Sequence, residues 1–278
     1  ALASLGHSVS VVSGPPYPHL DANITLHKLP SLDLYARGLS SVTWRQIWQD
    51  PLARREWWSK LTGGFVEPWT FGERARQWLL EHADSFDVIH DNQTLSDGIL
   101  SLQDAGLPLV TTIHHPITRD RKLACEAETR WYNKLLVLRW YDFLTMQQRV
   151  ARKLDHIVTV SGVSRRDIVA DFGVDPRRVA VMYNGVDVDL FTPRPDQARK
   201  PNQIMATASA DTPTKGLHIL LPAVADLIAA GRDINVVLIG KPRQGGDTEQ
   251  LIRRLGLEPH IRWYHDLEQE RIVDLYAE

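Results

Sequence analysis

Short apolar runs that alternate with longer helical segments constrain the fold of this chain more than any other feature. The runs are rich in valine and isoleucine and almost continuously apolar, as is typical of strands buried on both faces. They lie at 7–13, 86–91, 108–115, 156–161, 178–184, 203–209, 234–240 and 261–265. Crossover helices are predicted between them, at 95–105, 127–154, 164–172, 216–231 and 248–255. This alternation predicts an α/β fold with parallel, doubly wound sheets and right-handed crossovers.

A stretch at 192–202 interrupts the alternation. It has three prolines and no apolar periodicity, which predicts a linker between a first domain, 1–195, and a second, 201–278. The second domain has few predicted strands, so we expect it to be incomplete. The first residues resemble the end of a helix and the last lie within an amphipathic helical pattern, so we also expect a fragment at both ends.

Composition excludes several classes of protein. With 43% hydrophobic and 24% charged residues, the chain has the profile of a soluble globular protein. Its formal charge of −2 provides no field for a nucleic-acid backbone, so nucleic acid is not an expected partner. The longest apolar stretch, 217–230, is too polar to span a membrane. The single cysteine, Cys125, cannot form an internal disulfide, which predicts a cytoplasmic protein.

Tryptophan is concentrated in residues 32–80, a segment that does not follow the alternation. Six of the nine tryptophans lie there: Trp44, Trp48, Trp57, Trp58, Trp69 and Trp78. Their largely helical spacing favours a helical flap packed on the sheet. The alternative is a platform for an acceptor molecule, because aromatic faces suit sugar rings or the boundary of lipid headgroups. The sequence leaves both interpretations open.

Two segments place polar residues where α/β proteins bind ligands, although the motifs GxGxxG, GxxxxGK[ST], HExxH and GxSxG are absent. A turn with Asp211 and Pro213 follows the run at 203–209 and leads to Lys215 and Gly216 at the start of a helix. Backbone N–H groups, the helix dipole and an ammonium group together suit a diphosphate. The segment VTTIHHPI places two histidines at the carboxyl end of a strand, the edge at which open sheets bind ligands.

The order of several segments resembles the retaining glycosyltransferases of family 4, which have the GT-B fold. These segments are GHSVSVVS, FDVIHDN, PLVTTIHH, VTVSGVSRRDIVADFGV, VMYNGVDVDLFTP, SADTPTKGL and VVLIGK. The resemblance implies two Rossmann-like domains with parallel sheets facing a cleft. It implies an acceptor mainly on the first domain, a nucleoside diphosphate sugar as co-substrate mainly on the second, and no cofactor or metal. In the NGVD element, Asp187 is expected to close the turn and Asp189 to start a short helix rather than to bind a metal.

The resemblance also assigns roles to single residues. His114 matches the histidine of the family's T-x-H motif near the transferred sugar, and a neutral imidazole can hydrogen-bond a sugar hydroxyl at pH 7. Lys215 matches the lysine that neutralises the leaving diphosphate, so both residues are predicted to be catalytic. His115, expected to point to the opposite face of the strand, and Asn92 are predicted on the acceptor side.

The residues predicted to bind the donor share a place at strand ends and helix starts of the second domain. They are Ser209, Lys215, Gly216, Gly240, Lys241, His265 and Asp266. Ser209 stands where many family members have an arginine, so either Lys241 or Arg243 supplies that charge or the donor binds more weakly. The family's glycine-rich first loop and its paired glutamates would lie before residue 1 and after residue 278, so we expect the fragment alone to be inactive.

The sequence therefore predicts a hexosyltransferase that moves a sugar, with retention, from a nucleoside diphosphate sugar to an unknown glycan, lipid or small-molecule acceptor. One alternative is a nucleotide-sugar 2-epimerase of the same fold. The other is a non-catalytic GT-B protein that binds a sugar nucleotide, and Ser209 in place of the arginine favours this second alternative. Basic and apolar residues at 119–153 match two interpretations: peripheral contact with the inner face of the membrane, or a long half-buried helix.

Overall fold

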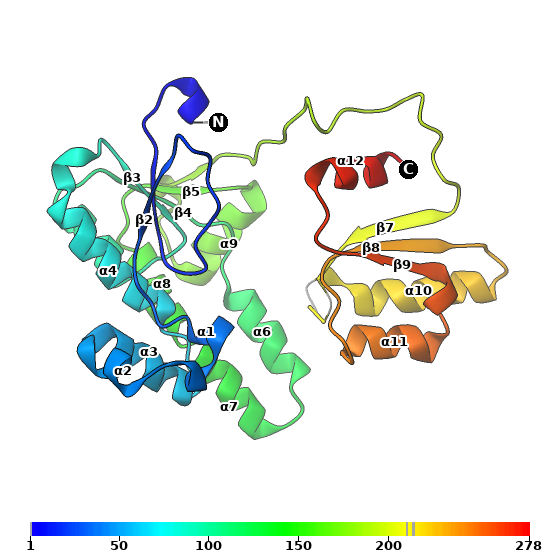
Figure 1. Ribbon diagram of the computed structural model, residues 1–278, viewed down its shortest axis with the longest axis horizontal. Coiled ribbons are helices and arrows are strands. Elements are labelled where there is room, and N and C mark those ends of the chain that lie inside the picture. Colours follow the sequence, from blue (N-terminus) through cyan, green and yellow to red (C-terminus); the bar gives the residue numbers. More distant parts are fainter. Residues whose placement is uncertain (1, 210, 213–214) are drawn as a thin grey trace. The chain divides into compact units, whose positions relative to one another are not determined.

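The computed structural model describes residues 2–209, 211–212 and 215–278 (Figure 1). The chain forms two compact units: unit 1 is Ala1–Asn184 and unit 2 is Gly185–Glu278. The division falls before the proline-rich stretch 192–202, which contains no helix or strand and belongs to unit 2. An ion pair of 2.6 Å between Arg194 and Asp274 ties this stretch to the last helix.

Every strand pair among the described residues is parallel. In unit 1, β1 (Ser10–Ser13) pairs with β2 (Thr25–Lys28), and a second sheet has the order β3 (Ile89–Asn92), β4 (Leu109–Thr112), β5 (Ile157–Thr159) and β6 (Val179–Val181). Unit 2 has β7 (Gln203–Thr207), β8 (Asn235–Ile239) and β9 (Ile261–Tyr264) in that order. The predicted α/β class with parallel sheets is confirmed. Each apolar run contains a strand, whereas β2 was not predicted because its sequence, TLHK, is half polar.

The helices of unit 1 are α1 (Leu34–Arg37), α2 (Trp44–Gln49), α3 (Pro51–Leu61), α4 (Glu67–Glu81), α5 (Asp97–Asp104), α6 (Thr118–Ala127), α7 (Trp131–Trp140), α8 (Phe143–Ala151) and α9 (Gly162–Phe172). Those of unit 2 are α10 (Leu217–Ala229), α11 (Asp247–Leu255) and α12 (Gln269–Ala277). The prediction of a single helix over 127–154 was wrong. The backbone is extended at Glu128 and Arg130 and leaves the helical conformation again at Tyr141, so this region forms α6, α7 and α8.

The tryptophan-rich segment folds as the helices α1 to α4. Leu34, Ile47 and Ala53 form a small core of their own among α1, α2 and α3. Helix α4 contributes Ala75 and Leu79 to the main core of unit 1, which also contains residues of β4 and β5. The segment is therefore helical and is joined to the main core through α4.

The sheet of unit 2 is covered on both faces, as Figure 1 shows for α10 and α11 on one side and α12 on the other. Strand β8 alternates accordingly: Val236 and Leu238 share a core with α10 and α11, whereas Val237 and Ile239 pack with Leu275 of α12. A strand buried on both faces explains why its sequence is continuously apolar. The second unit thus has a core independent of the first.

Replacing Gly98 by alanine should destabilise unit 1, because α4 and α5 are in contact at this position. An added Cβ would lie 2.3 Å from the carbonyl oxygen of Gly72, and overpacking of this kind costs about 1–3 kcal/mol. Gly162→Ala is the matched control, since nothing lies within 4 Å of its added Cβ at the start of α9. Urea unfolding measures the stability of both variants. Equal midpoints would show that α4 and α5 can move apart far enough to admit the added Cβ.

Candidate active site

The carboxyl ends of β3 and β4 bring Asn92 and His114 together. Asn92 ends β3 and is in register with Thr112, which ends β4. His114 follows two residues later, and its Nε2 lies 2.8 Å from Asn92 Oδ1. Because an amide oxygen only accepts, Nε2–H donates, and Nδ1 of the neutral ring remains an acceptor. Both side chains are exposed, so the pair is available to a ligand.

Gln93 holds the backbone beside His114 and was not predicted. Its Oε1 accepts from the backbone N–H of His114 at 2.7 Å, and its Nε2 donates to the carbonyl of His115 at 2.9 Å. Gln93 is in the left-handed region, with φ of 61°. The Nε2 of Gln147 in α8 donates to the backbone carbonyl of Thr94, the residue after Gln93, at 3.2 Å. The only sequence signal for Gln93 is an amide directly after a predicted strand.

Asp91 fixes the same turn from the interior. Its two carboxylate oxygens accept from the backbone N–H groups of Thr94 and Leu95, each at 3.2 Å. Burial raises the pKa of Asp91 above its ordinary value, and the bonds from Thr94 and Leu95 oppose that shift. The buried carboxyl therefore satisfies two amides of the turn and positions Asn92 at its start.

His115 has a different partner from His114. Its Nε2 lies 3.2 Å from Asp120 Oδ2, in the first turn of α6. The expected opposite orientation rested on the alternation of a strand, but β4 ends at Thr112 and does not reach either histidine. Their hydrogen-bond partners, rather than a pleat, distinguish the two rings.

A pocket of about 290 Å³ lies beside Asn92, and we call it the Asn92 pocket. Gly14, which follows β1, and Pro30, which lies shortly after β2, contribute to one part of its wall. Phe71 and Phe65 contribute apolar surface from α4 and from the chain before it. The pocket thus lies at the carboxyl ends of parallel strands, the edge at which such sheets bind ligands.

The cation in the wall of the Asn92 pocket is already neutralised. Arg74 of α4 donates to Glu56 of α3 and, at 2.6 Å, to Asp50. Glu56 also accepts from the backbone N–H of Leu32 at 2.8 Å, and both Arg74 and Glu56 are buried. The described residues that line the pocket therefore offer no unpaired positive charge to an anion.

Glu67 also lines the Asn92 pocket, and its carboxyl makes no hydrogen bond or ion pair to the described residues. Burial and, to a smaller extent, the carboxylates of Glu56 and Asp33 raise the pKa of Glu67 to about 7, against an opposing effect of Lys60. The carboxyl therefore changes charge near neutral pH. No sequence signal marks this property, because an acidic residue in the first turn of a helix is ordinary.

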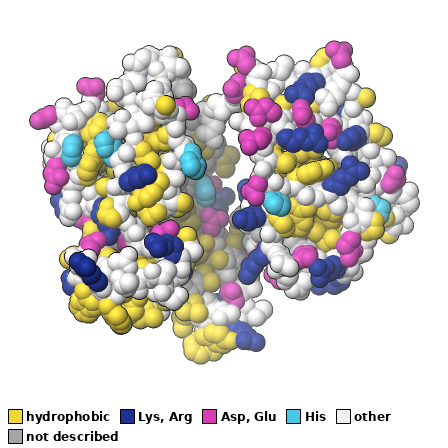
Figure 2. All heavy atoms as spheres, in the orientation of Figure 1, with side chains coloured by type: hydrophobic (Ala, Val, Ile, Leu, Met, Phe, Trp, Pro, Cys, Tyr) yellow, Lys and Arg dark blue, Asp and Glu magenta, His cyan; other side chains and the backbone are white. Residues whose placement is uncertain are grey.

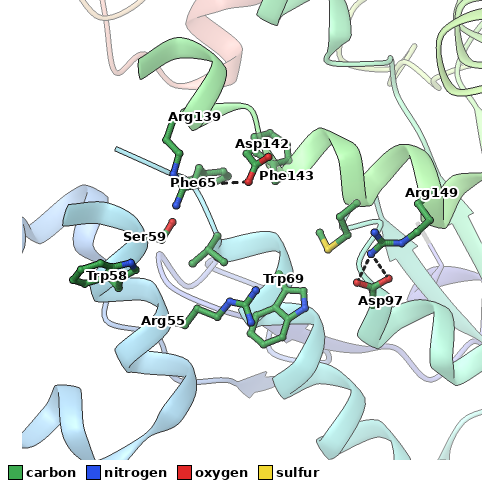
Figure 3. A pocket seen from close by; sticks show the side chains of 12 residues that line it. Arg55, Trp58, Ser59, Phe65, Trp69, Asp97, Arg139, Asp142, Phe143 and Arg149 are labelled. Carbon is green, nitrogen blue, oxygen red and sulfur yellow. Dashed lines mark hydrogen bonds and ion pairs between the residues drawn. The ribbon is translucent and has the colours of Figure 1, made fainter. Parts of the chain in front are cut away.

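A second pocket, of about 380 Å³, lies among α3, α4, α7 and α8, and we call it the helical pocket (Figure 3). Trp58 and Trp69 line it together with three arginines. Phe65 lines both the helical pocket and the Asn92 pocket, so the two adjoin. The side chains of Trp44 and Trp48, in contrast, are exposed outside both pockets, and Figure 2 shows hydrophobic side chains gathered on this part of unit 1.

In unit 2, Lys215 and Gly216 stand at the start of α10, as predicted. Gly216 has φ of 72° and precedes the first helical residue, and no side chain caps the helix there. Lys215 is exposed, and Ser209 is exposed after β7. The uncapped N–H groups and a nearby ammonium group favour an anion. Pro213, predicted in the intervening turn, lies outside the described residues.

Asp211 ties the loop after β7 to α11 instead of facing a ligand. Its Oδ1 accepts from the backbone N–H of Thr248 at 2.6 Å, and its own N–H donates to Thr248 Oγ1 at 3.0 Å. Gly246 leaves room for this carboxylate, since an added Cβ would lie 2.0 Å from Oδ2. The Nε of Arg243 lies 3.9 Å from the same oxygen. One of the two cations proposed to replace the missing arginine is thus directed to Asp211.

Gly240 brings the ends of β7 and β8 into contact. An added Cβ would lie 2.3 Å from the carbonyl oxygen of Ala208 and 3.2 Å from the nitrogen of Ser209. The N–H of Gly240 donates to Tyr264 at 2.8 Å, which ties the same point to β9. The chain segments that follow β7 and β8, with Ser209 and Lys241, therefore begin next to each other.

His265 and Asp266 form a pair after β9. His265 Nδ1 lies 2.9 Å from Asp266 Oδ2, and this hydrogen bond lowers the pKa of Asp266, with a smaller contribution from Lys241. Lys241 has no ion pair of its own within the described ranges. The structure thus groups Gly240, Lys241, His265 and Asp266 at one edge of the sheet.

The NGVD element forms a turn. Asp187 Oδ1 accepts from the N–H groups of Asp189 and Leu190, each at 3.1 Å, so the prediction that Asp187 closes the turn is confirmed. The prediction that Asp189 starts a helix was wrong, because 188–190 is an isolated turn. In the part of the chain that the structure describes, no three His, Cys, Asp or Glu side chains gather as metal ligands would. None of its helices is long and apolar enough to cross a membrane.

Comparison with known proteins gives the family. The model of Glycosyltransferase Family 4 matches residues 1–190, and that of Glycosyl transferases group 1 matches residues 191–278. The chain belongs to glycosyltransferase family 4. The predicted retaining glycosyltransferase of this family is thereby confirmed.

Two mannosyltransferases and a solved structure are among the similar proteins. This glycosyltransferase is 44% identical to the MMP alpha-(1→4)-mannosyltransferase of Mycolicibacterium hassiacum, over 99% of the chain and 67% of that protein. It is 27% identical to the phosphatidyl-myo-inositol mannosyltransferase of Mycolicibacterium smegmatis, over 94% of the chain and 57% of that protein. The crystal structure of WaaG, a glycosyltransferase involved in lipopolysaccharide biosynthesis, matches with a TM-score of 0.61 at 13% identity, over 99% of the chain and 65% of WaaG. The predicted GT-B type of fold is confirmed.

Glu67→Gln should change how stability depends on pH. A carboxyl with a raised folded-state pKa binds its proton more tightly in the folded protein, so its contribution is present below its ordinary value of 4.5 and is lost as pH rises through about 7. The glutamine variant lacks this loss, so its stability relative to wild type should be greater at about pH 8 than at about pH 5. Urea unfolding at both pH values measures the difference.

Glu81→Gln, at the exposed end of the same helix, controls for the removal of one negative charge. If the two glutamine variants respond to pH in the same way, Glu67 does not carry the dependence.

Proposed function

We propose that this protein transfers a mannosyl unit from a nucleoside diphosphate mannose to a sugar hydroxyl, with retention at the anomeric carbon. The observation that carries the proposal is the 44% identity to a mannosyltransferase over 99% of the chain. The second mannosyltransferase relative, at 27% identity, supports the same donor sugar. The chain spans 57–67% of the length of these two relatives, so the activity is proposed for the protein as a whole.

The donor is assigned to unit 2. Lys215 and the uncapped start of α10 would stabilise the charge that develops on the leaving diphosphate. Lys241 supplies the second positive charge in place of the arginine missing at Ser209, because it leaves β8 beside Ser209 while Arg243 lies near Asp211. Gly240 and the turn of His265 and Asp266 offer groups for the nucleoside at the same edge.

The acceptor is assigned to unit 1. Its reacting sugar would occupy the Asn92 pocket, where amide and carboxyl groups can bind hydroxyls and where Phe71 offers an apolar face. His114, held by Asn92 and Gln93, keeps Nδ1 free to accept from a hydroxyl of the transferred sugar. In the reaction the bond between the anomeric carbon and the phosphate oxygen breaks, and the bond to the acceptor oxygen forms on the same face. The acceptor proton passes to the departing phosphate oxygen, so atoms and charge balance without a cofactor.

Lys215→Ala should lower turnover by about 100-fold or more, because a contact to transition-state charge is removed. Initial rates with nucleoside diphosphate mannose and a mannoside acceptor measure this effect. Lys122→Ala, which removes an exposed lysine of α6, is the control and should keep the wild-type rate. Unchanged turnover in Lys215→Ala would remove this residue from the site.

Incubation with donor alone separates the alternatives. A mannosyltransferase without acceptor should leave the donor intact or hydrolyse it slowly, whereas an epimerase would yield the nucleotide sugar inverted at C2. Binding of the donor without either product, even when acceptor is added, would support a non-catalytic protein.

Peripheral membrane contact through α7 extends the proposal to acceptors held at a lipid surface. This helix exposes Trp131, Leu135 and Leu136, and Lys134 and Arg139 lie on the same helix. With such a surface, the protein should co-sediment with vesicles that contain phosphatidylglycerol but not with neutral phosphatidylcholine vesicles. Trp131→Ser should weaken the binding to the anionic vesicles. Sedimentation with neither kind of vesicle would contradict the membrane contact.

A further inference from the structure

The helical pocket combines the faces of tryptophan rings with arginine and aspartate side chains that form ion pairs. Trp58 of α3 is 61% exposed and borders the pocket, and Trp69 of α4 carries the guanidinium of Arg55 at 3.9 Å from its ring centroid. Figure 3 shows both tryptophans with Arg55 between α3 and α4. Arg55 and Trp58 are three residues apart on α3 and therefore share a face of that helix.

Two further arginines of the pocket are balanced by carboxylates. Arg149 of α8 donates to both oxygens of Asp97, at 2.8 and 2.7 Å. Arg139 lies 3.4 Å from Asp142 and also donates to Thr62 Oγ1 at 3.2 Å. Guanidinium and carboxylate groups in such pairs can donate to and accept from neighbouring hydroxyls without a net charge. Among the described residues that line the pocket, only Arg55 has no carboxylate partner, and its guanidinium lies over the ring of Trp69.

This chemistry fits a sugar ring better than an anion or a lipid chain. The C–H face of a sugar packs on an aromatic ring, while its hydroxyls need both donors and acceptors nearby. A phosphate group would need cations that are not already paired, and an acyl chain would need a lining without five charged side chains. A neutral sugar unit satisfies all of these groups.

The place of the pocket connects it to the reacting end of an acceptor. Phe65 lines both pockets, and the Asn92 pocket contains Asn92, the partner of His114. Neighbouring residues of the same segment divide between the two: Val66 lines the helical pocket and Glu67 lines the Asn92 pocket. A ligand that crosses Phe65 would therefore pass from one pocket into the other.

We propose that the helical pocket is a second acceptor subsite, which binds a neutral sugar unit of an oligosaccharide acceptor whose reacting unit occupies the Asn92 pocket. The inference rests on the proposed function and adds to it that the acceptor is a chain of sugars. Trp58 is the specificity-determining residue, because it offers the exposed ring against which a sugar unit beyond the first two of the acceptor packs.

Acceptor length tests the proposal. Binding of α-(1→4)-linked mannobiose and mannotetraose is measured by calorimetry in the absence of donor. Wild-type protein should bind the tetraose about 10-fold more tightly than the biose, and Trp58→Ala should remove that gain while leaving binding of the biose unchanged. Trp48→Ala is the matched control. The side chain of Trp48 is exposed to 63%, nearly the same fraction as the 61% of Trp58, but it lies outside both pockets. A tetraose bound no more tightly than the biose, or an equal effect of the two substitutions, would overturn the subsite.

A second matched pair separates recognition of a sugar from recognition of an anion. Arg55 lies over Trp69 in the pocket, whereas Arg54 lies 5.5 Å over Trp48 outside it. Arg55→Ala should weaken binding of the tetraose several-fold and Arg54→Ala should not. Inorganic phosphate should not compete with the tetraose, and competition that Arg55→Ala abolishes would make this an anion site and the proposal wrong.

These experiments also distinguish the subsite from the proposed function. If mannotetraose binds as expected but no mannose is transferred, the proposed activity fails and the subsite stands. If mannose is transferred equally well to short and long acceptors, the activity stands and the subsite fails.

Discussion

The buried ion pair between Arg74 and Glu56 is the interaction on which the ligand-facing surface of unit 1 depends. It joins α4 to α3, and the same glutamate accepts from the backbone of Leu32, so one carboxylate holds three segments of the chain. Removing one partner of a buried pair leaves an uncompensated charge and costs about 3–5 kcal/mol. Both pockets have walls from α3 and from the start of α4, so neither can keep its form without this contact.

Much of the fold follows from local pattern. The apolar runs predict strands such as β4, β5 and β8 because a strand buried on both faces must be apolar along its whole length. Lys215 and Gly216 were placed correctly at a helix start, because a glycine directly before an apolar helical segment can be recognised in the sequence. In the structure this glycine has a positive φ. Family resemblance pointed to His114, and Asn92 was predicted separately on the acceptor side. The hydrogen bond between these two residues, which lie 22 positions apart in sequence, was not predicted.

Other features depend on partners far away in the sequence and left no local signal. Asp211 looked like a turn residue beside a phosphate site, but Thr248, 37 residues later, takes its carboxylate. Glu67 was not singled out, because an acidic residue in a first helical turn is ordinary, and its raised pKa depends on burial and on the distant carboxylates of Glu56 and Asp33. Gln93 is an ordinary polar residue until the turn capped by Asp91 directs its amide to the backbone of His114. The break between α6 and α7 was missed because no proline or glycine marks it.

Phe65 belongs to both pockets and is also in contact with other rings: it stacks on Trp140 with ring centroids 5.0 Å apart and meets Tyr35 and Phe143 edge-on. A sugar bound on one side would restrict the motion of this ring, and the entropy lost in that step would not be lost again when the other side is filled. The two sides would then be coupled with positive cooperativity, and such coupling is reciprocal. An aromatic wall shared in this way would make the affinity for a ligand that spans it greater than the affinities of its two halves imply.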